Sequence, residues 1–213
     1  MDNAGISPSL VFNKLSRRYG RELQTQLKHS NLTTLFVAAL LSPQCTDRQV
    51  NKTTEELFKK FKTFEDYSKA DLGTLKRYLK GINYYKTKAR NLKAASVLVV
   101  KKFHGKVPNN MKDLMELQGV GRKVANVILN EGYGINEGIA VDTHVSVTAR
   151  RLGLAKSKDP YKIEQDIMRA FEKNRWGRVS NLLIALGRDT CKARNKECFR
   201  CVLRHMCLSS DAK

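Results

Sequence analysis

Four cysteines near the C-terminus constrain the structure of this chain more than any other feature. They follow the spacing C-x6-C-x2-C-x5-C, at Cys191, Cys198, Cys201 and Cys207. Structural zinc sites usually join two short Cys or His pairs across a longer loop, and only Cys198 and Cys201 form such a pair. A compact loop with four thiolates is better suited to one [4Fe–4S] cubane, so we expect these cysteines to bind an iron–sulfur cluster.

Two disulfides among the same cysteines are the alternative. Disulfides mainly stabilise small secreted domains, whereas this chain has 213 residues and no segment that resembles a signal peptide. We therefore expect a reducing compartment. The fifth cysteine, Cys45, lies in an apolar stretch, and we interpret it as a small buried hydrophobic residue.

The charge of the chain indicates a polyanionic partner. The 40 lysine and arginine residues outnumber 20 aspartate and glutamate residues, which gives a formal net charge of +20. The basic residues are spread along the sequence, so we expect charged faces on a folded body and nucleic acid as the partner. A basic protein of the membrane surface is disfavoured, because no apolar run is long enough to span a bilayer and no lipidation motif is present.

The apolar periodicity is helical almost throughout, which predicts an all-α fold. Hydrophobic residues make up 41% of the chain, enough for a proper core. Ser7 and Pro8 predict a helix start, and Gly20 follows the end of this helix. Thr33 or Thr34 is expected to cap a second helix, which has no charged face and should be buried. Further helices are predicted around residues 46–61, 70–80, 86–103, 110–116, 123–131, 143–152, 160–172 and 178–187.

The segment LQGVGRK, residues 117–123, lies between a short amphipathic helix and an apolar helix. Gly119 and Gly121 bracket Val120, and without Cβ atoms the two glycines allow a sharp turn and a close approach to another backbone. The N–H groups at the start of the next helix are then able to hold a phosphate. A helix-hairpin-helix element has these features and contacts the DNA backbone whatever the base sequence. A tight turn without a ligand explains the loop alone equally well.

Asp142 follows the apolar residues 139–141 and precedes a predicted helix. Its residue type and position predict a helix N-cap. A carboxylate held in this way is also suited to electrostatic or acid–base work.

Four segments together resemble the endonuclease III family of DNA glycosylases: LSPQCTD at 41–47, LQGVGRK at 117–123, IAVDTH at 139–144 and the four-cysteine loop. The resemblance covers nearly the whole chain and implies a two-lobed helix-hairpin-helix glycosylase fold. Residues 25–136 would form a six-helix barrel, and residues 1–24 and 137–213 a discontinuous helical domain with the [4Fe–4S] cluster. The resemblance also implies a monomer in the cytoplasm of a prokaryote, associated with the nucleoid.

The resemblance implies a bifunctional enzyme of base excision repair. It would remove oxidised pyrimidines from duplex DNA as an N-glycosylase, and would nick the abasic site by β-elimination as an AP lyase. Lys123 matches the lysine that attacks the sugar C1′ and forms a Schiff base, and Asp142 matches the partner carboxylate. From the local sequence alone, Lys123 is more simply interpreted as a phosphate contact.

The DNA contacts implied by the resemblance are at Gln44, Ile82, Tyr84, Gly119, Gly121 and Arg122. Gln44 and Tyr84 would fill the gap that an extruded nucleotide leaves in the stack. The alternatives for these two residues are a polar residue at a helix end and a half-buried aromatic residue. His144 is expected to be a structural hydrogen-bonding residue.

Three positions depart from the family pattern: Gln118 replaces a proline, Val124 a threonine and Val147 an arginine. None of these changes removes a catalytic group, but they bear on a local ion pair or phosphate contact.

Two rival functions remain. An adenine-mismatch monofunctional glycosylase typically lacks a lysine at the position of Lys123, and a non-enzymatic iron–sulfur redox sensor that binds DNA would leave Lys123 and Asp142 unexplained.

Overall fold

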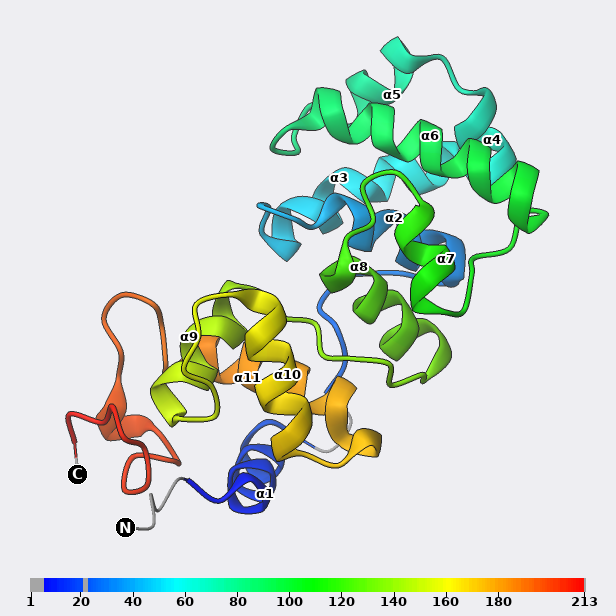
Figure 1. Ribbon diagram of the computed structural model, residues 1–213. Coiled ribbons are helices and arrows are strands. Elements are labelled where there is room, and N and C mark those ends of the chain that lie inside the picture. The colour runs from blue at the N-terminus through cyan, green and yellow to red at the C-terminus, as the bar shows by residue number, and fades with distance from the viewer. Residues whose placement is uncertain (1–5, 21–22, 213) are drawn as a thin grey trace. The chain divides into compact units, whose positions relative to one another are not determined.

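The structure is a computed structural model that describes residues 6–20 and 23–212. All regular elements in these ranges are helical (Figure 1), which confirms the predicted fold class. The chain divides into two compact units, Met1–Gln24 with Gly138–Lys213, and Thr25–Glu137. Within the described ranges, none of the helices combines the length and the apolar character that a membrane crossing requires.

The unit Thr25–Glu137 is built around an apolar helix, α2, whose residues from Thr34 to Leu41 are all buried. Helices α3, α6 and α8 pack against α2, and α6 runs along α4 and α5 (Figure 1). The helices are α2 (Leu32–Leu41), α3 (Asp47–Lys60), α4 (Phe64–Lys69), α5 (Leu72–Tyr78), α6 (Tyr85–Phe103), α7 (Met111–Glu116) and α8 (Arg122–Val127), and a π-helical turn follows at Ile128–Gly132. The prediction that the second helix is buried is confirmed.

The start of α2 differs from the prediction. Asn31 is the N-cap, and its Oδ1 accepts a hydrogen bond from the backbone N–H of Thr34 at 2.9 Å. The Thr34 hydroxyl in turn accepts from the Asn31 backbone N–H at 3.0 Å, which completes a capping box. The prediction that Thr33 or Thr34 caps the helix is therefore wrong, because the helix begins earlier and Thr34 fills the reciprocal position.

Two other elements of this unit differ from what the sequence predicts. The short helix α4 is defined by a capping box between Thr63 and Asp66, and it buries Phe64 and Tyr67. Phe64 packs edge-on against Phe36 of α2, with ring centroids 5.3 Å apart. The helix predicted over 123–131 is divided into α8 and the π-helical turn Ile128–Gly132. Six residues give too little periodicity to identify α4 in the sequence.

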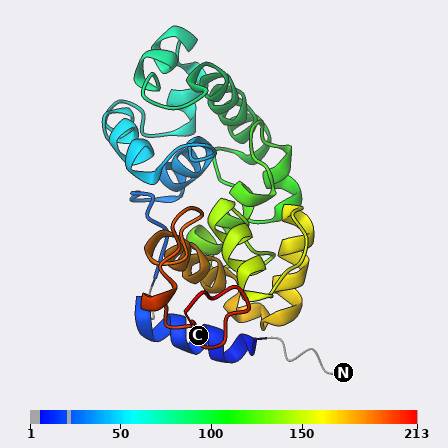
Figure 2. The same cartoon turned by 90° about the vertical axis from the view of Figure 1, so that its left-hand side faces the viewer.

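The second unit contains α1 (Pro8–Tyr19), α9 (Thr143–Leu152), α10 (Pro160–Ala170) and α11 (Trp176–Asp189), with 3₁₀ turns at Lys173–Arg175 and Cys198–Arg200. The Ser7 cap and the positive φ of Gly20, 92°, confirm the predicted ends of α1. Helix α1 lies beside α11 in both views (Figures 1 and 2). Helix α9 approaches α11 so closely that a Cβ at Gly187 would lie 2.9 Å from the Cβ of His144.

We predict that Asn31→Ala lowers the free energy of unfolding by about 1 kcal/mol, because the N-cap acceptor of the central helix is lost. Urea denaturation measures this change. Asn31→Asp is the matched control and should retain most of the stability, since aspartate caps as well as asparagine. An alanine variant as stable as the parent protein would contradict the importance of this cap.

Candidate functional site

The loop between α7 and α8 has the sharp turn that its two glycines predict, but the glycines play different parts. Gly119 has φ +85°, and a Cβ there would lie 2.7 Å from Nδ2 of Asn91. The close approach is therefore to a side chain of α6. This differs from the prediction, which was a close approach to another backbone. Val120 is buried and anchors the turn. Gly121 is the N-cap of α8, and a Cβ there would meet nothing within 4 Å.

Lys123 lies in the first turn of α8 and is half-buried. Its Nζ donates a hydrogen bond to Oγ of Ser42 at 3.0 Å, and that hydroxyl donates to the Ala39 carbonyl at 2.9 Å. The end of α2 thus holds the amine through one serine. Ser42 lies inside the LSPQCTD segment, but no pattern in the sequence indicated this contact. The next residue, Val124, is buried in the core.

The structure brings Gln44 and Tyr84 onto neighbouring loops. Nδ2 of Asn83 donates to the Gln44 carbonyl at 2.7 Å, and the Gln49 side chain donates to the Gly81 carbonyl. Gln44 and Tyr84 both have left-handed backbones, with φ of 59° and 58°. Non-glycine residues in this region carry strain of about 1–3 kcal/mol, and such strain clusters at functional sites.

The side chains of these two loops differ in exposure. Gln44 is exposed and Tyr84 is 68% exposed, so the alternative interpretation of Tyr84 as a half-buried aromatic residue is wrong. Ile82, predicted as a DNA contact, is 2% exposed and belongs to the core. Its side chain therefore packs into the core and anchors the loop that carries Tyr84. A single apolar residue in a loop gave no sign of this burial in the sequence.

Asp142 is the N-cap of α9, as predicted. Its Oδ1 accepts a hydrogen bond from the backbone N–H of Val145 at 2.8 Å, and the residue is half-buried. Asp142 belongs to the unit that contains Gly138–Lys213, whereas Lys123 belongs to Thr25–Glu137. His144 in the same helix packs against Gly187. The hydrogen bond expected of its side chain stays a prediction.

The four C-terminal cysteines are free thiols, of which Cys207 is buried and the other three are half-buried. Burial raises the pKa of Cys201 and Cys207, while backbone N–H groups of Leu203 and Ser209 act in the opposite direction on Cys201 and Cys207 respectively. The charges of Cys191 and Cys198 also raise the pKa of both thiols, so Cys201 and Cys207 each lie within electrostatic reach of these two cysteines. Among the described residues, no group of three or more His, Cys, Asp or Glu is placed to hold a metal ion.

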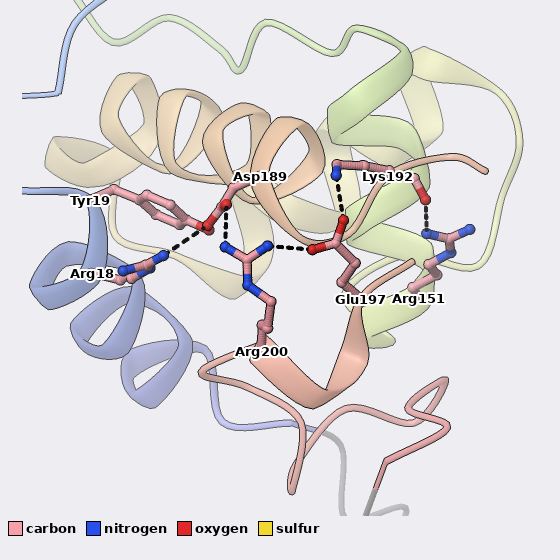
Figure 3. Close-up of polar contacts among 7 residues, drawn as sticks. All are labelled: Arg18, Tyr19, Arg151, Asp189, Lys192, Glu197 and Arg200. Carbon is pink, nitrogen blue, oxygen red and sulfur yellow. Dashed lines mark hydrogen bonds and ion pairs between the residues drawn. The ribbon is translucent and has the colours of Figure 1, made fainter. Parts of the chain in front are cut away.

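Arg151, in the last turn of α9, fixes the segment that begins at Cys191. Its guanidinium donates to the carbonyls of Cys191, Lys192 and Ala193 at 3.2, 2.7 and 3.0 Å. It also contacts the Cys191 sulfur at 3.4 Å, and the Cys207 thiol donates to the Arg151 carbonyl at 3.4 Å. Figure 3 shows the bond to Lys192. The sequence did not indicate this role of Arg151, because a basic residue at a helix end has no specific signal.

A polar network joins α1 to the cysteine segment (Figure 3). Asp189, at the end of α11, accepts from the Tyr19 hydroxyl at 3.0 Å and from Arg18 at 3.3 Å. Arg200 lies 3.9 Å from the same carboxylate and also pairs with Glu197 at 2.5 Å. Burial, together with the hydrogen bond to Asp189, raises the pKa of Tyr19 to about 12. The phenol thus stays a hydrogen-bond donor at neutral pH.

Comparison with known proteins identifies the family. Residues 37–173 match the HhH-GPD superfamily, described as base excision DNA repair proteins. The endonuclease III of Bacillus subtilis is 40% identical over 185 residues, which cover 86% of this chain and 84% of that protein. The endonuclease III of Treponema pallidum is 39% identical over 211 residues, which cover 99% of this chain and 98% of that protein. This chain belongs to the endonuclease III family.

A solved structure of endonuclease III supports the same conclusion. It is described as a trapped covalent intermediate with DNA, in a complex with an estranged adenine, and it is similar to this chain with a TM-score of 0.90. The two sequences are 35% identical, and the match covers 94% of each chain. The family and the helical glycosylase fold predicted from the sequence motifs are therefore confirmed.

In this member of the endonuclease III family, we predict that Gly119→Ala lowers the free energy of unfolding by about 1–3 kcal/mol, because alanine is strained at this left-handed position. The added methyl would also contact Asn91. Gly121→Ala is the control two residues away and should cost less, under about 1 kcal/mol, because only the preference of the N-cap for glycine over alanine is lost and the added methyl meets nothing within 4 Å. Urea denaturation of both variants measures the difference. Equal losses would contradict the distinction between the two glycines.

Proposed function

We propose that this protein is a bifunctional DNA glycosylase and AP lyase that acts on oxidised pyrimidines in duplex DNA. The observation that carries the proposal is the amine of Lys123, placed in the first turn of α8 directly after the hairpin loop. Membership of the endonuclease III family supports it. The covalent DNA intermediate in the related solved structure fits a nucleophilic residue in this family.

In the proposed reaction, the neutral amine of Lys123 attacks C1′ of the damaged nucleotide. The bond between C1′ and the base breaks, the base leaves with the electron pair and takes up a proton, and the opened sugar forms an imine with Nζ. Loss of a proton from C2′ then expels the phosphate at C3′, which nicks the strand. Hydrolysis of the imine restores the amine. The hydrogen bond with Ser42, at 3.0 Å, favours one orientation of Nζ before the attack.

We assign an electrostatic role to Asp142. Positive charge develops on the sugar as the base leaves, and a fixed carboxylate stabilises that charge or assists proton transfer. The bond from the Val145 N–H to Oδ1 fixes the orientation of the side chain. An N-cap position thus serves the helix and the proposed reaction together.

The remaining residues are proposed to bind the DNA. Gln44 and Tyr84 are exposed and lie on loops joined by hydrogen bonds, which suits side chains that enter the gap left by an extruded nucleotide. A Cβ at Gly121 would meet nothing within 4 Å, and the N–H groups of Gly121 and Arg122 lie at the start of α8, where they are suited to a phosphate. Ile82 is buried in the core and anchors the loop that carries Tyr84. We do not assign it a direct contact with DNA.

We propose that Cys191, Cys198, Cys201 and Cys207 hold one [4Fe–4S] cluster. The fit rests on the donor set of four free thiols, in which Cys201 and Cys207 each lie within electrostatic reach of Cys191 and Cys198 and receive backbone N–H groups. In a cubane each thiolate binds a different iron, so the sulfurs need not converge on a single ion. When bound, the cluster would cross-link the C-terminal segment. We accordingly propose residues 1–24 with 137–213 as the cluster domain and 25–136 as the barrel domain.

Trapping with borohydride tests whether Lys123 is the nucleophile. Borohydride should trap a covalent adduct of the parent protein with a duplex that carries an oxidised pyrimidine, because it reduces the imine irreversibly. Lys123→Gln should abolish both the adduct and strand nicking, since an amide cannot form the imine. Gel electrophoresis measures both products. Nicking at the parental rate by Lys123→Gln would exclude the proposed nucleophile, and base removal by the parent protein without an adduct would favour a monofunctional glycosylase.

Asp142→Asn provides the second arm of this experiment. It should slow base removal by about 100-fold or more, because the charge is lost while the cap is kept. Processing of a pre-formed abasic site should be affected less, because the base has already gone. Equal effects on both substrates would contradict a role in base removal.

The colour of the purified protein tests the cluster proposed for the four cysteines. The purified protein should be yellow-brown, with broad absorption at the blue end of the visible spectrum. Cys198→Ser should reduce this colour and the yield of folded protein together. Metal analysis and visible spectroscopy measure the outcome. Colourless, zinc-loaded protein with full activity would contradict the proposed cluster.

A further inference from the structure

Lys88 is a buried lysine that the proposed reaction does not use. It lies in the first turn of α6 and is 8% exposed. Its ammonium group donates to the carbonyls of Leu41 at 2.8 Å and Pro43 at 2.6 Å, and to the sulfur of Cys45 at 3.2 Å. An ammonium group has three donors, so these three partners use all of them.

The partners of Lys88 lie at the point where α2 ends. The last carbonyl groups of a helix have no partner within the helix and carry the negative end of its dipole. Helix α2 has no basic residue in its own last turn, so Lys88 supplies the positive charge from α6. Burial of an ammonium group is unfavourable unless its hydrogen bonds are made, so its three bonds offset that cost.

The backbone that Lys88 binds also carries two residues of the proposed site. Ser42 accepts the hydrogen bond from Lys123 Nζ at 3.0 Å. Gln44 has the strained left-handed backbone and is exposed. Lys88 binds the carbonyls on either side of Ser42 and the side chain that follows Gln44, while Asn83 binds the Gln44 carbonyl from the other loop. A strained backbone persists only where its surroundings hold it in this way.

We propose that Lys88 is a positioning residue for the reaction described above. It fixes residues 41–45 so that Ser42 holds the amine of Lys123 and Gln44 stands out from the surface. Lys88 itself does not react, because its three donors are directed at acceptors of the protein. The inference rests on the proposed function, and its test therefore includes one measurement that does not depend on activity.

Lys88→Met is the test variant, because methionine has an unbranched side chain like that of lysine but lacks the charge and the hydrogen-bond donors. Lys93→Met is the matched control. Lys93 lies on the same helix, is half-buried, and donates to the carbonyl of Ala70, away from residues 41–45. Both variants lose a lysine bond to a main-chain carbonyl, so a general effect on stability should appear in both.

The first measurement is the single-turnover rate at saturating enzyme, for base removal and for nicking of a pre-formed abasic site. Lys88→Met should lower both rates by about 10- to 100-fold, the size expected for a small misplacement of reacting groups. Its affinity for undamaged duplex should change by less than about threefold, since the phosphate contacts remain. Lys93→Met should leave all three quantities within about twofold of the parent protein.

The second measurement is amide hydrogen exchange. The Cys45 backbone N–H donates to the Ser42 carbonyl at 3.0 Å, and it reports directly on the fixed segment. Lys88→Met should accelerate exchange at this amide, whereas Lys93→Met should not. Parental exchange at Cys45 in folded Lys88→Met would overturn the proposal whether or not the protein is active. A parent protein without glycosylase or lyase activity would instead overturn the proposed function and with it a role of Lys88 in that reaction, while exchange at Cys45 would still decide whether Lys88 fixes residues 41–45.

The third measurement is a double-mutant cycle between Lys88→Met and a variant that carries both Ser42→Ala and Gln44→Ala. Because Lys88 acts through Ser42 and Gln44, the loss of rate from Lys88→Met should be much smaller in this background. Additive losses would overturn the proposal. If Lys88→Met does not fold, Lys88→Arg takes its place, since its planar fork keeps the charge but cannot supply three donors from one point. Parental rates together with parental exchange at the Cys45 amide in Lys88→Arg would likewise overturn it.

Discussion

The unit Thr25–Glu137 depends on the burial of one apolar helix, α2. Helices α3, α6 and α8 pack around it, and its residues from Thr34 to Leu41 contribute no charged face to the surface. Each large apolar side chain removed from water contributes about 1.5–3 kcal/mol. The last carbonyl groups of such a buried helix still need hydrogen-bond donors. Residues outside α2 must supply these donors at Leu41 and in the segment that follows it.

That requirement explains the contacts of Lys88 at the end of α2, and a second lysine, Lys123, reaches the same segment through a hydroxyl group. Lys88 binds the carbonyls of Leu41 and Pro43, and Lys123 binds the hydroxyl of Ser42. The packing of α6 and α8 against α2 thus places both lysines at the end of α2. There Lys88 stabilises the structure, close to the amine of Lys123 that is proposed to react. The left-handed backbones of Gln44 and Tyr84 are held beside them by contacts between their loops.

The C-terminal segment is stabilised in a different way. Its residues include few buried apolar side chains, Leu203 and Cys207 among them. Arg151 binds its backbone, and Asp189, Glu197 and Arg200 join it to α1 and α11. Partly exposed ion pairs contribute little each, about 0–1 kcal/mol, so a cross-link among the four thiols would add most to this segment.

The sequence by itself determined the helical class, the family, the burial of α2, the hairpin loop and the N-cap role of Asp142. The family follows from the resemblance of the four sequence segments, and the other features follow from periodicity, from the paired glycines of the loop and from capping residues, all of which are local. Tertiary structure alone decided that Ser42 contacts Lys123, that Ile82 is buried and Tyr84 exposed, and that Lys88 and Arg151 bind distant backbone segments. A lysine or arginine on a helix has the same local signal whether it faces water or a carbonyl group, because its partners lie far away in the sequence.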